Sequence, residues 1–402
     1  MFKRTVTSTL ISLATQFPVV TITGPRQSGK TTLCRTTFPD KPYINLEQPE
    51  IRQFAKDDPK GFFATIPDGA ILDEIQRVPE LLSYIQVIVD EKNIPGLFIV
   101  TGSQQFEVMN TINQSLAGRT ALLKLLPLSI EELSAAGIEC TPNQLILNGF
   151  YPRIHNQKLN PTRVLGDYFE TYVERDIRQL VAIKNLGLFE KFIRLCAGRV
   201  GQILNLQSLG NDVGISHSTA REWLTLLEAS YIVFQLRPWH SNISKRLVKS
   251  PKLYFFDVGL ASYLLGLETE LHVMRDPLRG NLFENMAVVE ALKYRYNRGG
   301  KAHFFFYRDS NGNEVDLLLQ AGPDLFPVEI KSGETIAPDF FKGLSNFSKI
   351  SPELTRGAGL VYGGSEQQKR SLAEIWPIVR MHEMLNGVYR SNAAQGECNC
   401  AS

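Results

Sequence analysis

Residues 24–31 read G-P-R-Q-S-G-K-T, between an apolar run and an expected helix. In the pattern G-x-x-x-x-G-K-[ST], the glycines let the loop fold so that backbone N–H groups and the helix N-terminus surround a phosphate. The lysine reaches the β- and γ-phosphates, and the threonine hydroxyl ligates Mg²⁺. We therefore predict an ATP site with Mg²⁺. Its binding residues are Gly24, Pro25, Arg26, Gln27, Ser28, Gly29, Lys30, Thr31 and Thr32.

Short apolar runs alternate with helical stretches around and after this motif. The runs cover residues 19–24, 43–47, 69–75, 97–103 and 121–129. Strands that are apolar on both faces and separated by helices imply a mostly parallel sheet with helices on both sides. The sequence thus predicts an α/β P-loop domain over residues 1–150.

Two acids follow the third of these runs, in "GAILDEIQRVPEL". A P-loop site needs an acidic residue at the end of a buried strand to hold Mg²⁺, and we assign this role to Asp73. Glu74 is then the group that polarises the attacking water. The alternative is a pair of exposed acids at a strand end, with no part in chemistry.

Further catalytic candidates lie at the ends of the next two runs. Thr101 and Ser103 stand at the tip of one strand, where Ser103 either orients the water or caps the loop. Arg119 precedes the last strand. An arginine at the γ-phosphate stabilises the transition state. Three roles stay open for Arg119: the site of its own subunit, the site of a neighbour in a homo-oligomer, or a surface ion pair.

Composition limits the wider context. The chain has 402 residues, 43% hydrophobic and 21% charged, as expected for a soluble globular protein of two or three domains. Its net charge of +2 argues neither for nor against nucleic-acid binding, so any basic surface must be local. No apolar run approaches the ~20 residues that span a bilayer. The N-terminus lacks a secretory h-region. We expect a cytoplasmic protein without a membrane partner.

The middle of the chain changes to helices. Residues 151–190 are expected to form a helical connector, and residues 191–265 a winged-helix-like segment. In the second, Gly214 marks a turn and Ser216 caps the next helix, whose exposed start could read bases. That start carries His217, Ser218, Thr219 and Arg221. It has little positive charge, which argues against base-specific reading, and a protein–protein role is the alternative.

A basic stretch follows this helix-turn-helix pattern. Residues 237–252 contain almost no acids and form the best phosphate-binding patch of the sequence. Its cations are Arg237, Lys245, Arg246, Lys249 and Lys252. We predict contact with double-stranded DNA through this segment and the helix before it.

Three strands are expected between residues 302 and 332, with an Asn-Gly turn after the first. Alternation places Glu314 and Asp316 on one face of the second strand, and Glu329 and Lys331 on one face of the third. Adjacent strands would bring Asp316, Glu329 and Lys331 together. Carboxylates of this kind bind Mg²⁺. The alternative is a solvated charged face.

Several motifs together resemble one family. They are "ILDEIQRVPEL", "FIVTGSQQF", "SLAGRTALLKLLPLSIEEL", "YFETYVERDIRQL", "KSPKLYFFDVGLASYL", "LRGNLFENMAVVEAL" and "NEVDLLL…FPVEIKSG". The chain resembles, up to about residue 365, the bacterial and archaeal AAA-type ATPases that carry a DUF4143 C-terminal region. The resemblance implies a P-loop ATPase domain, a winged-helix-like segment and a domain similar to the PD-(D/E)XK nuclease fold at 266–385. Residues 386–402 are expected to be disordered.

The nuclease-like fold implies a metal site in the C-terminal domain. The roles carried over are metal ligation by Glu284, Asp316 and Glu329, and positioning of the attacking water by the catalytic Lys331. The leading hypothesis is Mg²⁺-dependent ATP hydrolysis that controls a DNA-binding, nuclease-like C-terminal half. The alternatives are an ATP-dependent switch that acts on a protein partner and a DNA-binding regulator whose nuclease-like domain is inert.

Overall fold

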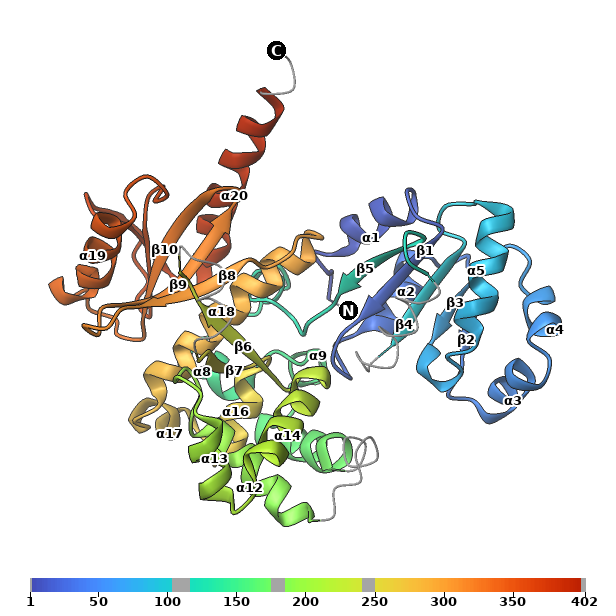
Figure 1. Cartoon of the computed structure of the whole chain (residues 1–402), viewed down its shortest axis with the longest axis horizontal. Coiled ribbons are helices and arrows are strands. Elements are labelled where there is room, and N and C mark those ends of the chain that lie inside the picture. Colours follow the sequence, from blue (N-terminus) through green and yellow to red (C-terminus); the bar gives the residue numbers. More distant parts are fainter. Residues whose placement is uncertain (1, 103–115, 175–184, 241–249, 399–402) are drawn as a thin grey trace.

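The computed structural model describes residues 2–102, 116–174, 185–240 and 250–398. Its first part is a five-stranded sheet with all strands parallel, in the order β2-β3-β4-β1-β5 (Figure 1). The strands are β1 (Val19–Thr23), β2 (Tyr43–Asn45), β3 (Ala70–Asp73), β4 (Phe98–Gly102) and β5 (Thr120–Lys124). The predicted parallel sheet is confirmed, and β4 lies between the strands that carry the P-loop and Asp73.

Helices cover both faces of this sheet because successive side chains of each strand point to opposite sides. Val20 and Ile22 pack with α1 (Thr7–Ala14) and α2 (Lys30–Thr37). Val19 packs on the other face, which three further helices cover. These are α3 (Pro49–Asp57), α4 (Pro59–Ala64) and α5 (Leu81–Lys92). The carboxyl edge of the sheet therefore lies open between two helical layers.

The second part is mostly helical. Its elements are α7 (Ile130–Ala135), α8 (Pro142–Asn148), α9 (Pro152–Gln157), α10 (Pro161–Tyr168), the π-helix η2 (Phe169–Glu174), α12 (Leu186–Ala197), α13 (Leu206–Val213), α14 (His217–Ala229), α16 (Val258–Leu264) and α17 (Glu270–Arg275). Ser129 and Glu132 form a capping box at the start of α7, so the chain leaves the sheet through a fixed helix. Among the described residues, no helix is both long enough and apolar enough to cross a membrane.

The expected helix-turn-helix is present. Gly214, with φ of 93°, separates α13 from α14, and the Ser216 side chain accepts a hydrogen bond from the Thr219 N–H. The apolar side chains of the two helices are buried in the core, among them Leu209, Val213, Trp223, Leu224 and Leu227. Two antiparallel strands follow, β6 (Val233–Pro238) and β7 (Lys252–Phe255).

The third part is an eight-stranded sheet in the order β12-β13-β11-β10-β9-β8-β6-β7. Its remaining strands are β8 (Phe304–Arg308), β9 (Glu314–Ala321), β10 (Asp324–Lys331), β11 (Gly359–Tyr362), β12 (Gln368–Lys369) and β13 (Glu374–Pro377). The predicted antiparallel meander is β8-β9-β10. The helices around it are α18 (Arg279–Asn297), α19 (Lys342–Ile350) and α20 (Met381–Cys398). The described part of the chain also contains three short 3-10 helices, η1 (Ile75–Arg77), η3 (Pro338–Phe341) and η4 (Ile378–Arg380).

Two features of the structure bear on the expected domain division. β6 pairs with β8 through Arg237↔Phe305 and Pro238↔Phe306, so a boundary at residues 265–266 cuts through one sheet. One hydrophobic core also runs from the helices after β5 to α20. α20 continues to Cys398, where disorder was expected from residue 386, because Met384 and Leu385 bury its first turns in that core. Figure 1 shows α20 extending away from the sheet.

Candidate functional site

The P-loop connects β1 to α2 at the carboxyl edge of the parallel sheet. At Gly24, where φ is +153°, a Cβ would stand 2.1 Å from the Leu125 carbonyl oxygen, so only glycine fits. Gly29 has φ of +94° immediately before α2. Gln27 adopts φ of 60°, a strained backbone of the kind that occurs at ligand sites. The sequence therefore forms the expected loop, which leads directly into the N-terminus of α2.

Lys30 is the first residue of α2 and is buried. Its Nζ donates to the carbonyl oxygens of Gly24, at 3.0 Å, and Pro25, at 2.8 Å. Burial lowers the pKa of Lys30 to about 8, although Glu74 and Asp73 oppose this effect. A phosphate at the loop would favour the charged ammonium, because an anion stabilises a nearby cation.

Asp73 ends β3 and accepts hydrogen bonds from three hydroxyl groups. Thr31 Oγ1 donates to its Oδ2 at 2.8 Å, and Thr101 Oγ1 donates to its Oδ1. Tyr43 Oη donates to Oδ2 at 2.7 Å. The structure thus brings together Thr31 and Asp73, the two residues assigned to Mg²⁺. Tyr43 was missed because a tyrosine in an apolar strand has the pattern of a core residue.

Glu74 follows Asp73 and adopts φ of 59°. Its backbone N–H donates to Thr101 Oγ1 at 3.3 Å, and its carboxylate accepts a hydrogen bond from Gln76 Nε2. The left-handed backbone places Glu74 in the lining of a cavity of about 580 Å³, together with Lys30. Ser103, the other predicted water-orienting residue, lies outside the described residues.

A second cavity, of about 620 Å³, adjoins this one. Both volumes fall within the range of small-molecule sites, roughly 300–1,000 Å³. The two cavities share Gly29 and Thr32 from the P-loop side, and Pro152 and Arg153 from α9. The sequence did not single out Arg153, because only the packing of α9 against the first part of the chain brings it to the loop.

Arg4 is a further residue that sequence reasoning missed. Its buried guanidinium donates to Ser28 O at 2.7 Å, to Glu132 Oε1 at 3.0 Å and to Leu126 O at 2.8 Å. It thereby fixes the P-loop to the segment that leaves the sheet. Ser28 Oγ is buried and has no hydrogen-bond partner among the described atoms. A buried hydroxyl without a partner is consistent with a loop whose hydrogen-bond donors bind a phosphate.

These residues fit an Mg²⁺–nucleotide. Mg²⁺ usually keeps several waters and takes one or two protein oxygens besides the substrate phosphates. Thr31 and Asp73 offer such oxygens beside the cavity that Lys30 lines.

Arg119 lies away from the P-loop of its own chain. It directly precedes β5, and its carbonyl accepts a hydrogen bond from the Val19 N–H at the start of β1. The P-loop begins at the opposite end of β1, a five-residue strand of roughly 16 Å. The Arg119 guanidinium pairs with Asp90, with Nε–Oδ1 at 2.5 Å and Nη2–Oδ2 at 2.8 Å. Three roles were left open for Arg119, and this structure contains the contact that belongs to one of them, the surface ion pair.

The acidic residues of the C-terminal part converge as expected. Lys331 Nζ lies 2.5 Å from Glu329 Oε1 and 3.5 Å from Asp316 Oδ2. Glu284 of α18 reaches the same cluster from the other side. Burial and then Asp316 raise the pKa of Glu329 to about 8 and that of Glu284 to about 7. Burial lowers the pKa of Lys331, but Asp316 and Glu329 together raise it above its usual value.

A buried lysine, Lys252, pairs with the carboxylates of this cluster. Lys252 is 3% exposed, and its Nζ lies 2.8 Å from Glu284, 2.5 Å from Glu314 and 4.0 Å from Asp316. Over the residues that the structure describes, no three His, Cys, Asp or Glu side chains are placed to hold one metal ion. The predicted metal ligation in this cluster therefore stays a prediction. The residues concerned are Glu284, Asp316 and Glu329.

Lys252 is also removed from the predicted phosphate-binding patch, because it is buried and paired with carboxylates. Arg237 is exposed, and so is Arg221 on α14. Ser218 is exposed at the start of α14, whereas His217 and Thr219 are half-buried. The other three cations of the patch, Lys245, Arg246 and Lys249, fall outside the described residues.

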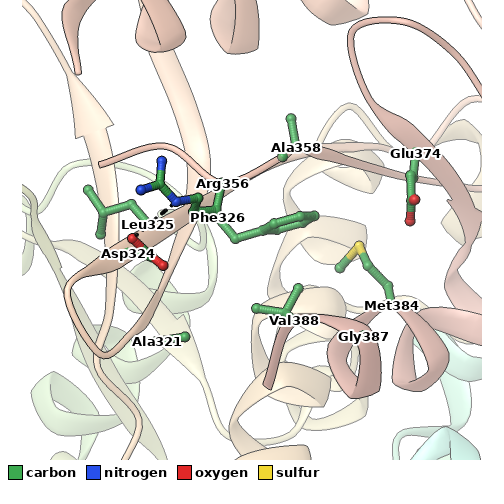
Figure 2. Close-up of a pocket in the computed structure, with 11 residues that line it drawn as sticks. Ala321, Asp324, Leu325, Phe326, Arg356, Ala358, Glu374, Met384, Gly387 and Val388 are labelled. Carbon is green, nitrogen blue, oxygen red and sulfur yellow. Dashed lines mark ion pairs between the residues drawn. The ribbon is translucent and has the colours of Figure 1, made fainter. Parts of the chain in front are cut away.

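A third cavity, of about 410 Å³, lies between β10, the start of β11 and α20 (Figure 2). Phe326, Met384 and Val388 form an apolar side, and an ion pair of Asp324 with Arg356, at 3.5 Å, lies at its edge. The cavity shares no lining residue with the P-loop or with the acidic cluster.

Comparison with known families agrees with these parts. Residues 16–134 match an AAA domain, residues 141–271 match DUF8612, a domain of unknown function, and residues 279–383 match DUF4143, also a domain of unknown function. The chain is similar to uncharacterized proteins of Mycobacterium tuberculosis and Mycobacterium bovis. Each is 29% identical over 353 residues, which cover 87% of this chain and 77% of the relative.

Two solved structures are similar in part. One is a Walker-type ATPase of Pyrococcus abyssi, with a TM-score of 0.44 and 16% identity over 66% of this chain and 96% of that one. The other is a DNA replication initiation factor, with a TM-score of 0.28 and 15% identity; the match covers 60% of this chain and 84% of that one. At these scores neither carries an argument about activity. The P-loop geometry and two of the three family matches lead to one conclusion: residues 16–134 form an AAA domain with a P-loop, and residues 279–383 form a C-terminal DUF4143 domain.

Proposed function

We propose that the protein is an Mg²⁺-dependent ATPase whose nucleotide state sets the conformation of its C-terminal half. The observation that carries the proposal is the contact of Thr31 with Asp73 beside a cavity lined by Lys30 and Glu74. These are the groups that P-loop hydrolysis requires, at the edge of the sheet where it requires them.

Each residue has a role in in-line attack of water on the γ-phosphate. Lys30 and the N–H groups of the loop would bind the phosphates, and Thr31 and Asp73 would hold Mg²⁺, which would supply positive charge to the phosphates. Glu74 accepts a proton from the water and orients it. Arg153 reaches the nucleotide from α9. Catalysis in this class rests on positioning and charge stabilisation, which these fixed groups supply.

Three contacts support coupling to the rest of the chain. Thr23, the residue before the P-loop, shares a hydrogen bond of 3.0 Å with Tyr231, which follows α14. Arg4 joins the P-loop to Glu132 of α7. The Ile130 N–H at the start of α7 donates to Glu290 of α18 at 2.8 Å. A change at the phosphate site would therefore act directly on groups that hold α14 and α18.

ATP turnover by purified full-length protein tests the proposal. We expect Mg²⁺-dependent phosphate release that is lost in Lys30→Ala, together with retained ATP binding but slow hydrolysis in Glu74→Gln. Limited proteolysis with ADP and with a non-hydrolysable ATP analogue should give different cleavage patterns after residue 141. Equal hydrolysis in Glu74→Gln would contradict the role of Glu74, and identical proteolysis patterns would contradict the coupling.

A second candidate function is contact with double-stranded DNA. It rests on the exposed Arg221 near the start of α14 and the exposed Arg237 on the adjacent strand. Phosphate contacts of this kind give salt-dependent, sequence-independent binding. We expect a labelled duplex to bind at low salt and to lose affinity in the double variant Arg221→Ala, Arg237→Ala. Equal binding by the variant would leave a protein partner as the ligand of this face.

A further inference from the structure

The carboxylates of the C-terminal cluster surround a cation that belongs to the preceding segment. Lys252 is the first residue of β7, whereas its partners Glu284, Glu314 and Asp316 lie on α18 and β9. Its ammonium is almost completely buried and also lies 5.5 Å from the centre of the Phe306 ring. The position that a bound ion would take between these carboxylates is therefore occupied by a side chain of the protein.

The backbone around Lys252 holds the ammonium in place. β7 pairs with β6 on one side, and Lys252 forms a bridge with Ile203 on the other. The Leu204 N–H donates to the Pro251 carbonyl at 2.8 Å. Two residues further along the same face of β7, Tyr254 Oη donates to Glu284 Oε1 at 2.5 Å. Two side chains of one strand thus bind the same carboxylate oxygen of Glu284.

Counting charges shows why a divalent ion does not fit beside Lys252. Four carboxylates meet here, Glu284, Glu314, Asp316 and Glu329, and three cations pair with them, Lys252, Lys331 and Arg308. With all four carboxylates ionised, the sum is one negative charge. Adding a divalent ion would make it one positive charge, with the new ion against the buried ammonium. Like charges at such distances in a buried site repel strongly.

An ammonium also differs from a metal ion in what it does. It donates hydrogen bonds to the carboxylates, but it has no open coordination position at which water is activated or a phosphate oxygen is bound. The cluster with Lys252 in place is therefore suited to joining β7 to the C-terminal sheet. It is not suited to metal-assisted cleavage of a phosphodiester.

We propose that Lys252 is a built-in cation that takes the place of a divalent metal ion, so that the carboxylates of Glu284, Glu314 and Asp316 bind such an ion only when Lys252 is removed. This inference concerns the C-terminal cluster and stands independently of ATP hydrolysis. It assigns the same three carboxylates two mutually exclusive cations, one covalently attached and one from solution.

Titration of nucleotide-free full-length protein with MnCl₂ tests the proposal. Binding is measured as the loss of the signal of free Mn²⁺ in electron paramagnetic resonance. Wild type should show no Mn²⁺ binding that depends on Asp316. Lys252→Met should gain one Mn²⁺ per chain and lose it again in the double variant Lys252→Met, Asp316→Asn. Lys293→Met, which removes a buried lysine outside the cluster, is the matched control and should gain none.

Two results would overturn the proposal. One is Mn²⁺ binding by wild type that disappears in Asp316→Asn, because the metal would then coexist with Lys252. The other is a folded Lys252→Met that gains no ion. If Lys252→Met unfolds in the absence of metal, its thermal transition is measured with increasing Mn²⁺. A midpoint that rises with Mn²⁺ supports the site, and one that stays constant in both Lys252→Met and Lys252→Gln contradicts it.

Discussion

Thr23 Oγ1 and Tyr231 Oη share a buried hydrogen bond of 3.0 Å, although the two residues are 208 positions apart in the chain. Thr23 is the last residue of β1 before the P-loop, and Tyr231 follows the second helix of the helix-turn-helix. The hydroxyl pair thus connects the strand that leads into the phosphate-binding loop with the segment proposed to contact DNA.

A double-mutant cycle measures the strength of this connection. Tyr231→Phe and Thr23→Val each remove one hydroxyl and should each lower the free energy of unfolding by about 1 kcal/mol, a typical net value for one buried hydrogen bond. The double variant should lose less than the sum of the two, because both single variants break the same bond. Urea unfolding provides the measurement, and strict additivity would show that the two hydroxyls do not interact.

Breaking the buried Arg4–Glu132 pair should be costly. Arg4→Met leaves Glu132 buried without its partner and frees the Ser28 carbonyl. Loss of one member of a buried pair destabilises a protein by about 3–5 kcal/mol. Arg380→Met, in the exposed pair with Glu383, is the control and should leave the urea midpoint almost unchanged. Similar shifts for the two variants would contradict a structural role for Arg4 at the loop.

Arg153 should contribute to nucleotide affinity from outside the parallel sheet. Because it lines both cavities at the P-loop, Arg153→Ala should weaken ATP binding about tenfold, or ~1.4 kcal/mol. Titration of a fluorescent ATP analogue measures the affinity. Arg163→Ala on the next helix, away from both cavities, is the matched control. Unchanged affinity in Arg153→Ala would show that α9 only borders the site.

Arg119 gives a test of self-association. It lies at the far end of β1 from the P-loop and pairs with Asp90, so Arg119→Ala should hydrolyse ATP as wild type does at a concentration where the protein is monomeric. Steady-state turnover measured over a range of protein concentrations makes the comparison. A defect that appears only as concentration rises would assign Arg119 to the site of a neighbouring copy.

His155 should make stability depend on pH. Burial lowers its pKa, Lys293 lowers it further, and a hydrogen bond with the Gly149 carbonyl opposes them. Because the pKa of this histidine is lower in the folded state, the unfolded state binds the proton more readily. Its contribution to the free energy of unfolding is therefore complete above about pH 6.5 and is lost as the pH falls. Unfolding free energies between pH 7 and 5 should therefore fall less steeply in His155→Gln than in wild type.

The P-loop, the parallel sheet and the meander were predictable because each depends on local patterns: glycine spacing, apolar runs and strand alternation. The convergence of Asp316, Glu329 and Lys331 followed from alternation alone. Lys252, Arg4 and Arg153 were not recognised, since their roles come from contacts between segments more than 20 residues apart. Lys252 shows the limit clearly. In the sequence it is one of several cations in a basic stretch, and only the pairing of β7 turns it inward.

The pairing of β6 with β8 has a mechanical consequence. The strand that follows the helix-turn-helix is at the same time a strand of the C-terminal sheet, so backbone hydrogen bonds join the two parts. Because Tyr231 lies two residues before this strand, we expect a displacement of Tyr231 to be passed on to the eight-stranded sheet as well as to the helix-turn-helix.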